Sequence, residues 1–127
     1  MANTLPTGST AITDPSNPQN QLKVNADGSI TIGSGNTTTG TKSNVAGSAS
    51  SVTILASNTS RKGAMVYNDS TAILYLDLSG GTASSSSYSV QVSSQGFFEL
   101  PGPTIYNGAI TGIWASANGS ARVTEFS

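Results

Sequence analysis

Residues 64–78 have the sequence AMVYNDSTAILYLDL, and this stretch decides the fold class. Two apolar segments, residues 64–68 and 73–78, are separated by the polar residues Asn68–Thr71, which are of types common in turns. In the second segment leucine occupies every second position, from Leu74 to Leu78, and the alternate positions hold Ile73, Tyr75 and Asp77, so the strand is apolar on both faces for much of its length. A strand that is apolar on both faces belongs at the centre of a sheet or under a covering layer.

The same pattern continues through the second half of the chain. Further short strands are predicted at residues 52–56, 88–92, 97–100, 109–114 and 121–126. We expect three hairpins, formed by residues 64–68 with 73–78, 88–92 with 97–100, and 109–114 with 121–126. Seven strands with turn signals between them predict an all-β fold, a compact antiparallel β-sandwich or jelly-roll-like barrel over residues 51–127.

Residues 1–50 have a different composition, because all eight aromatic residues of the chain lie after residue 60. A segment so poor in apolar side chains cannot offset the entropy lost on ordering, so an extended N-terminal arm is predicted. One alternating stretch near residues 21–32, with Asp27-Gly28 at its turn, predicts a β-hairpin. Residues 33–51 are rich in Gly, Ser and Thr and are expected to form a linker, with the domain boundary near residue 50.

Charge and hydropathy argue against two classes of partner. The net charge is −1, and the five basic residues are spread along the chain, so no nucleic acid is expected. No apolar run is long enough to span a bilayer, so no membrane is expected either. The N-terminal residues lack the basic and apolar segments of a signal peptide, which favours synthesis and first folding in a cytoplasm.

Catalytic residues are scarce. The sequence has no His and no Cys, which removes the commonest general base and thiolate metal sites. A hydrolase pair of Asp77 and Glu99 stays open as a minor hypothesis, since two carboxylates suffice for glycoside hydrolysis. The acidic residues are too scattered for a calcium loop. We therefore expect a non-enzymatic protein with no cofactor and no metal site.

Three aromatic residues are candidates for contacts. Trp114 lies in an ordinary strand pattern and is predicted to be in the core, because a lone Trp in a small β-domain is usually buried. Phe97 and Phe98 are neighbours on one strand, so they must point to opposite faces. One is expected inside, and the other is a candidate exposed contact with a partner.

Two polar features have alternative interpretations. Arg61-Lys62-Gly63 is predicted to be a solvated turn, or else to supply a salt bridge to an acidic neighbouring subunit. Four Asn-x-Ser/Thr triplets are attributed to chance in a chain with 38 Ser and Thr residues, and they begin at Asn36, Asn58, Asn68 and Asn118.

Several stretches carry a family resemblance. They are RKGAMVYNDSTAILY at residues 61–75, GFFELP at 96–101 and GAITGIWASA at 108–117, preceded by a leader over residues 5–30. Together they resemble a module of small virion structural proteins of tailed bacteriophages. The resemblance implies a capsid decoration (cement) or head-fibre protein, and it supplies no catalytic or ligand position.

The expected function is therefore structural, on the outer surface of a virion capsid. The partners expected are the major capsid protein or another virion protein, and sister copies in a homo-oligomer, with a trimer favoured. The apolar residues available to anchor the arm to such a partner are Leu5, Ile12, Leu22, Val24, Ile30 and Ile32. The alternative is a tail- or fibre-associated module that binds a receptor or glycan through exposed aromatic residues.

Overall fold

The computed structural model describes residues 13–14, 17–21, 26–28 and 36–127. The chain forms two compact units, residues 1–33 and residues 34–127. In the first unit, β1 (Thr13–Asp14) pairs antiparallel with β2 (Asn17–Gln21). The predicted hairpin near residues 21–32 falls mainly outside the described residues, apart from its turn, where Gly28 has a φ of +83°.

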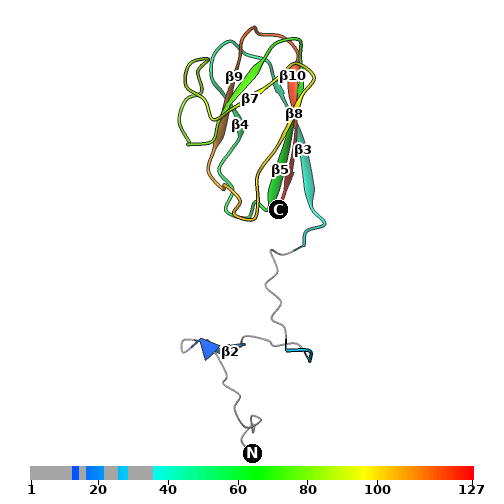
Figure 1. Cartoon of the computed structure of the whole chain (residues 1–127), viewed down its shortest axis with the longest axis vertical. Helices are drawn as coiled ribbons and strands as arrows, with labels where there is room; N and C mark the ends of the chain where they lie inside the picture. The colour runs from blue at the N-terminus through cyan, green and yellow to red at the C-terminus, as the bar shows by residue number, and fades with distance from the viewer. Residues whose placement is uncertain (1–12, 15–16, 22–25, 29–35) are drawn as a thin grey trace, which may run out of the picture. The chain divides into compact units, whose positions relative to one another are not determined.

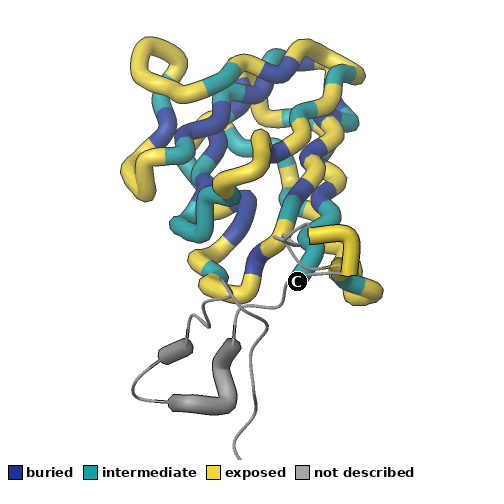
Figure 2. The backbone as a smooth tube through the Cα atoms, turned by 60° about the horizontal axis from the view of Figure 1, so that its bottom comes forward, coloured by how far each residue is buried: buried dark blue, intermediate teal, exposed yellow. Residues whose placement is uncertain are grey.

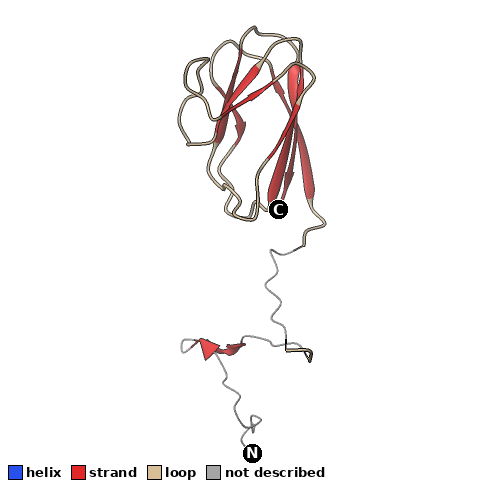
Figure 3. Cartoon of the chain, viewed as in Figure 1, coloured by secondary structure: helices blue, strands red, loops and turns tan. Residues whose placement is uncertain are grey.

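The second unit is a sandwich of two four-stranded antiparallel sheets (Figure 1). Sheet I has the order β3-β10-β5-β8, and sheet II has the order β4-β9-β6-β7. The bounds are β3 Gly40–Ala46, β4 Val52–Leu55, β5 Gly63–Asp69, β6 Leu74–Asp77, β7 Val90–Val92, β8 Phe97–Glu99, β9 Ile110–Trp114 and β10 Ser120–Phe126. The described residues form strands and loops, with no helix among them (Figure 3), so the all-β sandwich prediction is confirmed.

The strand order is that of a jelly roll. The strands form four nested antiparallel pairs. The first strand of the sandwich pairs with the last, the second with the second-last, and so on to the middle: β3 with β10, β4 with β9, β5 with β8, and β6 with β7. Two further pairings, β10 with β5 and β6 with β9, close the sheets. This is one long hairpin rolled up into two layers, the eight-stranded jelly-roll arrangement.

The three predicted hairpins are wrong, although the strands themselves were placed well. In each predicted pair the two strands belong to different sheets: β5 and β6, β7 and β8, and β9 and β10. An apolar alternation indicates which face of a strand is buried, but it does not identify the neighbouring strand. The connecting loops cross the roughly 10 Å between two packed sheets instead of turning back within one.

The predicted linker also needs correction, because residues 40–46 form β3 and pair with β10 along its whole length. The sandwich unit therefore begins near Ser34, not near residue 51. Five of the first six residues of β3 are exposed and only Val45 packs against the core, so no apolar alternation marked this strand. Its backbone pairing with β10, which needs no apolar side chains, holds it in the sheet.

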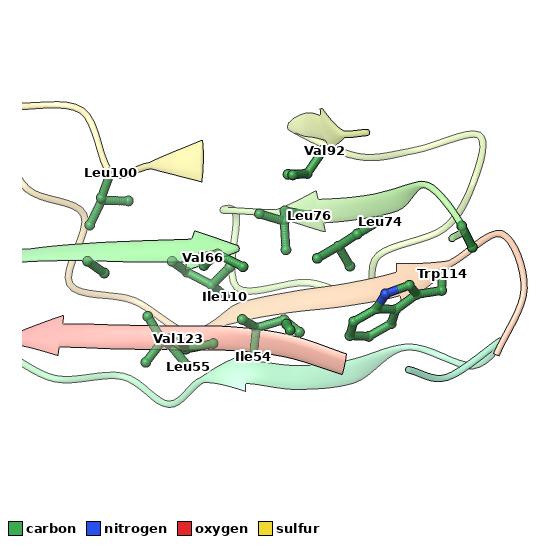
Figure 4. Close-up of a cluster of buried hydrophobic side chains, with 13 residues drawn as sticks. Ile54, Leu55, Val66, Leu74, Leu76, Val92, Leu100, Ile110, Trp114 and Val123 are labelled. Atoms are coloured by element: carbon green, nitrogen blue, oxygen red, sulfur yellow. The ribbon is translucent and has the colours of Figure 1, made fainter. Parts of the chain in front are cut away.

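The core lies between the two sheets. Figure 4 shows Val66 and Val123 of sheet I among Leu74, Leu76 and Ile110 of sheet II, and each of these is almost completely buried. Burying one such side chain contributes about 1.5–3 kcal/mol. Burial alternates from residue to residue along the central strands β5 and β9, so these strands turn one set of side chains into the core and the other outward, and the tube of Figure 2 shows the mixture of buried and exposed positions.

Candidate functional site

The outer face of sheet I carries a group of exposed apolar side chains. Met65 and Tyr67 lie on β5 and Phe97 on β8, with exposed fractions of 40%, 37% and 67%. Tyr67 and Phe97 are direct cross-strand partners, and Met65 lies two residues from Tyr67 on the same face. We call these three residues the apolar cluster.

A tight turn over Ser93–Gly96 positions the cluster. Gln95 adopts a left-handed conformation, with a φ of 59°, and the Gly96 amide donates to the Ser93 carbonyl at 2.9 Å. The Tyr67 hydroxyl donates to Gln95 Oε1 at 2.6 Å, which ties the tyrosine ring to the turn before Phe97. The Tyr67 ring is therefore held at the turn that leads into β8.

The two neighbouring phenylalanines point to opposite faces of sheet I, as the pleat of a strand requires. Phe97 points outward, and Phe98 is half-buried and packs against the core. Phe98 is opposite Val66 across the strands, so it lines the inner face of sheet I. Of the two candidate contact residues, only Phe97 is exposed on the surface.

Polar groups border the cluster on the β10 side. Arg122 is the cross-strand neighbour of Tyr67, and its Nη2 lies 2.8 Å from Asp69 Oδ2 in an exposed ion pair. Such a pair contributes little to stability. An apolar centre with a polar rim is the usual composition of a protein–protein contact.

Trp114 is buried, as predicted, with 1% of its surface exposed. Its Nε1 donates to Asn68 Oδ1 at 3.2 Å. Asn68 is itself completely buried, and its Nδ2 donates to the carbonyls of Ala72, Val92 and Ser93. Sequence reasoning placed Asn68 in a surface turn and missed this network, because nothing local distinguishes a turn Asn from a buried one.

Arg61 is not part of a solvated turn, and this expectation is wrong. The side chain is fully buried, and its Nε lies 2.6 Å from Glu125 Oε1 of the same chain. The two terminal nitrogens donate to the carbonyls of Ala56, Tyr106 and Gly108. Several backbone acceptors converge where the loops meet, and only the planar guanidinium supplies donors in enough directions.

Asp77 and Glu99 do not form a pair. Asp77 is on β6 and faces outward from sheet II, whereas Glu99 is on β8 and faces outward from sheet I. Two carboxylates on opposite outer surfaces of a sandwich cannot flank one glycosidic bond. The structure therefore argues against the hydrolase pair considered from the sequence.

The Asp77 carboxylate instead organises the loop between β6 and β7. Its oxygens accept hydrogen bonds from the Ser79 hydroxyl at 2.7 Å, and from the amides of Ser79 and Gly81 and the Ser89 hydroxyl at 3.2 Å each. The Ser79 hydroxyl, helped by the other donors and opposed by burial, holds the pKa of Asp77 below its usual value of 3.8.

The proposed arm anchors, Leu5, Ile12, Leu22, Val24, Ile30 and Ile32, all lie outside the described residues. Of the Asn-x-Ser/Thr triplets, the one at Asn68 is inaccessible in the folded state, because its side chain is buried. Within the described ranges, no three His, Cys, Asp or Glu side chains come together. The described residues likewise include no helix long and apolar enough to cross a membrane.

Comparison with known proteins found no matching family model, no matching curated protein and no matching solved structure.

Proposed function

We propose that this chain is a non-enzymatic structural protein of a tailed-bacteriophage virion that decorates or cements the capsid. Its N-terminal arm would attach to the major capsid protein or another virion protein, and the sandwich would lie on the outer surface of the capsid. The protein would be made in the host bacterial cytoplasm and assemble as a homo-oligomer, with a trimer favoured. The resemblance of residues 61–75, 96–101 and 108–117 to virion modules supports this assignment.

The jelly-roll strand order is compatible with the proposal. Jelly rolls include viral capsid and lectin domains. This support is analogy at the level of the fold, which many unrelated functions share. The proposal therefore depends on surface features of this chain.

The apolar cluster is the observation that carries the proposal. Phe97 exposes two thirds of its surface beside two further exposed apolar side chains on a rigid sheet. Contiguous exposed apolar groups with a polar rim mark contact surfaces. The cluster lies at β8, an edge strand of sheet I, where a neighbour can approach from the side. We assign the cluster to contact between sister copies and the arm to contact with the capsid.

Decoration of capsids stripped of this protein tests both assignments. Full-length chain should be oligomeric by sedimentation and should bind the capsids. A chain lacking residues 1–33 should keep its oligomeric state but lose capsid binding, because the sandwich unit retains the cluster. Undiminished capsid binding by the truncated chain would refute the role of the arm.

Phe97→Ser should dissociate the oligomer, since a buried aromatic side chain near the centre of a contact often contributes 2 kcal/mol or more, by an order-of-magnitude estimate. Tyr88→Ser is the matched control, because Tyr88 has an exposed fraction of 42% but packs against Tyr75 on sheet II. If Phe97→Ser stays oligomeric while Tyr88→Ser dissociates, the contact surface has been assigned to the wrong sheet.

A further inference from the structure

The edge of β3 that faces away from β10 is the longest strand edge of the sandwich with which no described strand pairs (Figure 1). The other edge strands are shorter: β7 and β8 have three residues each, and β4 has four residues and a register shift. Short or irregular edges resist pairing with another chain. β3 has seven residues, no proline and an unbroken register with β10, so it lacks these protections.

Two backbone hydrogen bonds that continue the register of β3 with β10 show which residues face the free edge. The Gly47 amide donates to the Gly119 carbonyl at 2.9 Å, and the Ser127 amide donates to the Thr39 carbonyl at 3.2 Å. Hydrogen-bonded and non-hydrogen-bonded pairs alternate along an antiparallel ladder, so the odd-numbered residues of β3 point their N–H and C=O groups at β10. The even-numbered residues point theirs away from it: Gly40, Lys42, Asn44 and Ala46.

One antiparallel register pairs the whole of β3 with a second copy of β3. With Ser43 opposite Ser43 of the second copy, Lys42 lies opposite Asn44 and Gly40 opposite Ala46, so every N–H and C=O group on the free edge meets a partner. A register centred on Lys42 would place two lysines directly opposite each other, which is destabilising. A register centred on Asn44 would leave Gly40 unpaired. Lys42, the one charged residue of β3, thus selects the register rather than preventing pairing.

The side chains of Lys42 and Asn44 complement each other in this register. Lys42 has no hydrogen-bond or ion-pair partner among the described residues, so its ammonium group is free to donate. Asn44 Oδ1 receives only a long contact of 3.5 Å from Arg122 Nη1. The two-fold symmetry repeats the Lys42–Asn44 pair on the same face. A contact made by one strand from each copy is smaller than a standard protein–protein interface, so we expect a weak dimer.

We propose that β3 is a self-association edge, through which two copies of this chain pair about a two-fold axis between their Ser43 residues. The two copies of the four-stranded sheet I then form one continuous sheet. β8 is the opposite edge strand of sheet I, so the apolar cluster of each copy stays available for a separate contact. The inference does not rest on the proposed virion function, because it uses only the edge of β3.

Single cysteines in the full-length protein test the register, because the chain has no cysteine of its own. Ser43→Cys would place two thiols at a non-hydrogen-bonded pair, whose Cα atoms lie about 4.5 Å apart and allow a disulfide. Thr41→Cys is the matched control, equally exposed on the same face of β3. Its two thiols would lie four residues out of register, about 14 Å apart.

Under mild oxidation at about 0.5 mM protein, a concentration chosen for a weak contact, Ser43→Cys should give a covalent dimer on a non-reducing gel, and Thr41→Cys should give little. The same contrast is expected in a Phe97→Ser background, where the apolar cluster is disrupted. Equal cross-linking of the two cysteine variants, or none in Ser43→Cys, would overturn the proposal.

Substitutions of Asn44 test the contact without cysteine, by sedimentation of the Phe97→Ser chain at rising concentration. Asn44→Pro removes an N–H from the free edge, where proline is tolerated, and should abolish dimers while the melting temperature stays close to that of the parent. Asn44→Glu would face Lys42 of the second copy and should strengthen dimerisation by about fivefold, and Asn44→Lys should weaken it similarly. An Asn44→Lys variant that dimerises as its parent does would overturn the proposal. So would a parent that stays monomeric while Asn44→Pro loses capsid binding, which would assign the edge to another protein.

Discussion

At the scale of single residues, Asn68 links the two sheets at the point where the chain crosses between them. Its Nδ2 donates to carbonyls on both sides of the crossing, and its Oδ1 accepts from Ser70 Oγ at 2.7 Å and from Trp114 Nε1. Backbone carbonyls near the crossing thereby receive hydrogen bonds from the Asn68 side chain. A buried amide with every group satisfied makes the crossing specific as well as stable.

Asn68→Ala should lower the free energy of unfolding by about 2–4 kcal/mol, because it leaves several buried carbonyls and the indole N–H without partners. Urea denaturation followed by Trp114 fluorescence measures the loss. Asn118→Ala is the matched control: its Oδ1 accepts from the Thr71 amide and hydroxyl, but at an exposed site. The control should cost about 1 kcal/mol or less. Equal losses for the two variants would contradict a special role for the buried amide.

At the scale of elements, the β6–β7 connection is the only one between consecutive strands of the sandwich that stays within one sheet. It runs over residues 78–89, which is long for a hairpin. Asp77 fixes its first part through Ser79 and Gly81, and reaches its end through Ser89. The Ser89 hydroxyl also accepts from the Leu78 amide at 2.8 Å, which joins the two ends of the loop.

Asp77→Asn should therefore change the pH dependence of stability. The folded-state pKa of Asp77 lies below its unfolded value of 3.8, so the unfolded chain binds the proton more readily. The stabilisation is fully present above about pH 5 and is lost as the pH falls through the folded-state pKa.

Urea denaturation at several pH values measures this effect. The wild type should have a higher free energy of unfolding than Asp77→Asn near neutral pH. The difference between the two free energies should become smaller below about pH 4. Gln91→Ala is the control, because Gln91 lies on β7 and does not titrate. The difference in free energy of unfolding between this variant and the wild type should not vary with pH. A gap for Asp77→Asn that widens as the pH falls would contradict the proposed hydrogen bonding.

The sequence predicted β4 to β10 within a few residues, because each has apolar residues in a strand pattern with turn residues on either side. It also predicted that the strand at residues 73–78 is either central or covered on its second side, and β6 does lie between β9 and β7. Pairing between strands could not be predicted, since the partners β5 and β8 are separated by more than one intervening strand in the chain. For the same reason Phe97 could be identified as a contact candidate, but its cross-strand neighbour Tyr67 could not.

At the scale of the whole molecule, the jelly-roll order makes the first strand of the sandwich essential to the last. β10 lies between β3 and β5, and it pairs with each over its full seven residues. Without β3, β10 becomes an edge strand, and Val45 is lost from the rim of the core. A domain that began after residue 50, where composition predicts the boundary, would lack β3.

Two fragments distinguish the boundaries. Residues 34–127 contain all eight sandwich strands and should melt within a few degrees of the full-length chain, whereas residues 51–127 should melt at least about 10 °C lower or fail to fold. Thermal denaturation followed by circular dichroism measures both. Equal melting temperatures would show that β3 is an appended strand that the core does not need, and the compositional boundary would then be the structural one. A stable 34–127 fragment with an unstable 51–127 fragment would establish that a segment with almost no apolar side chains is integral to the fold, held by main-chain hydrogen bonds to β10.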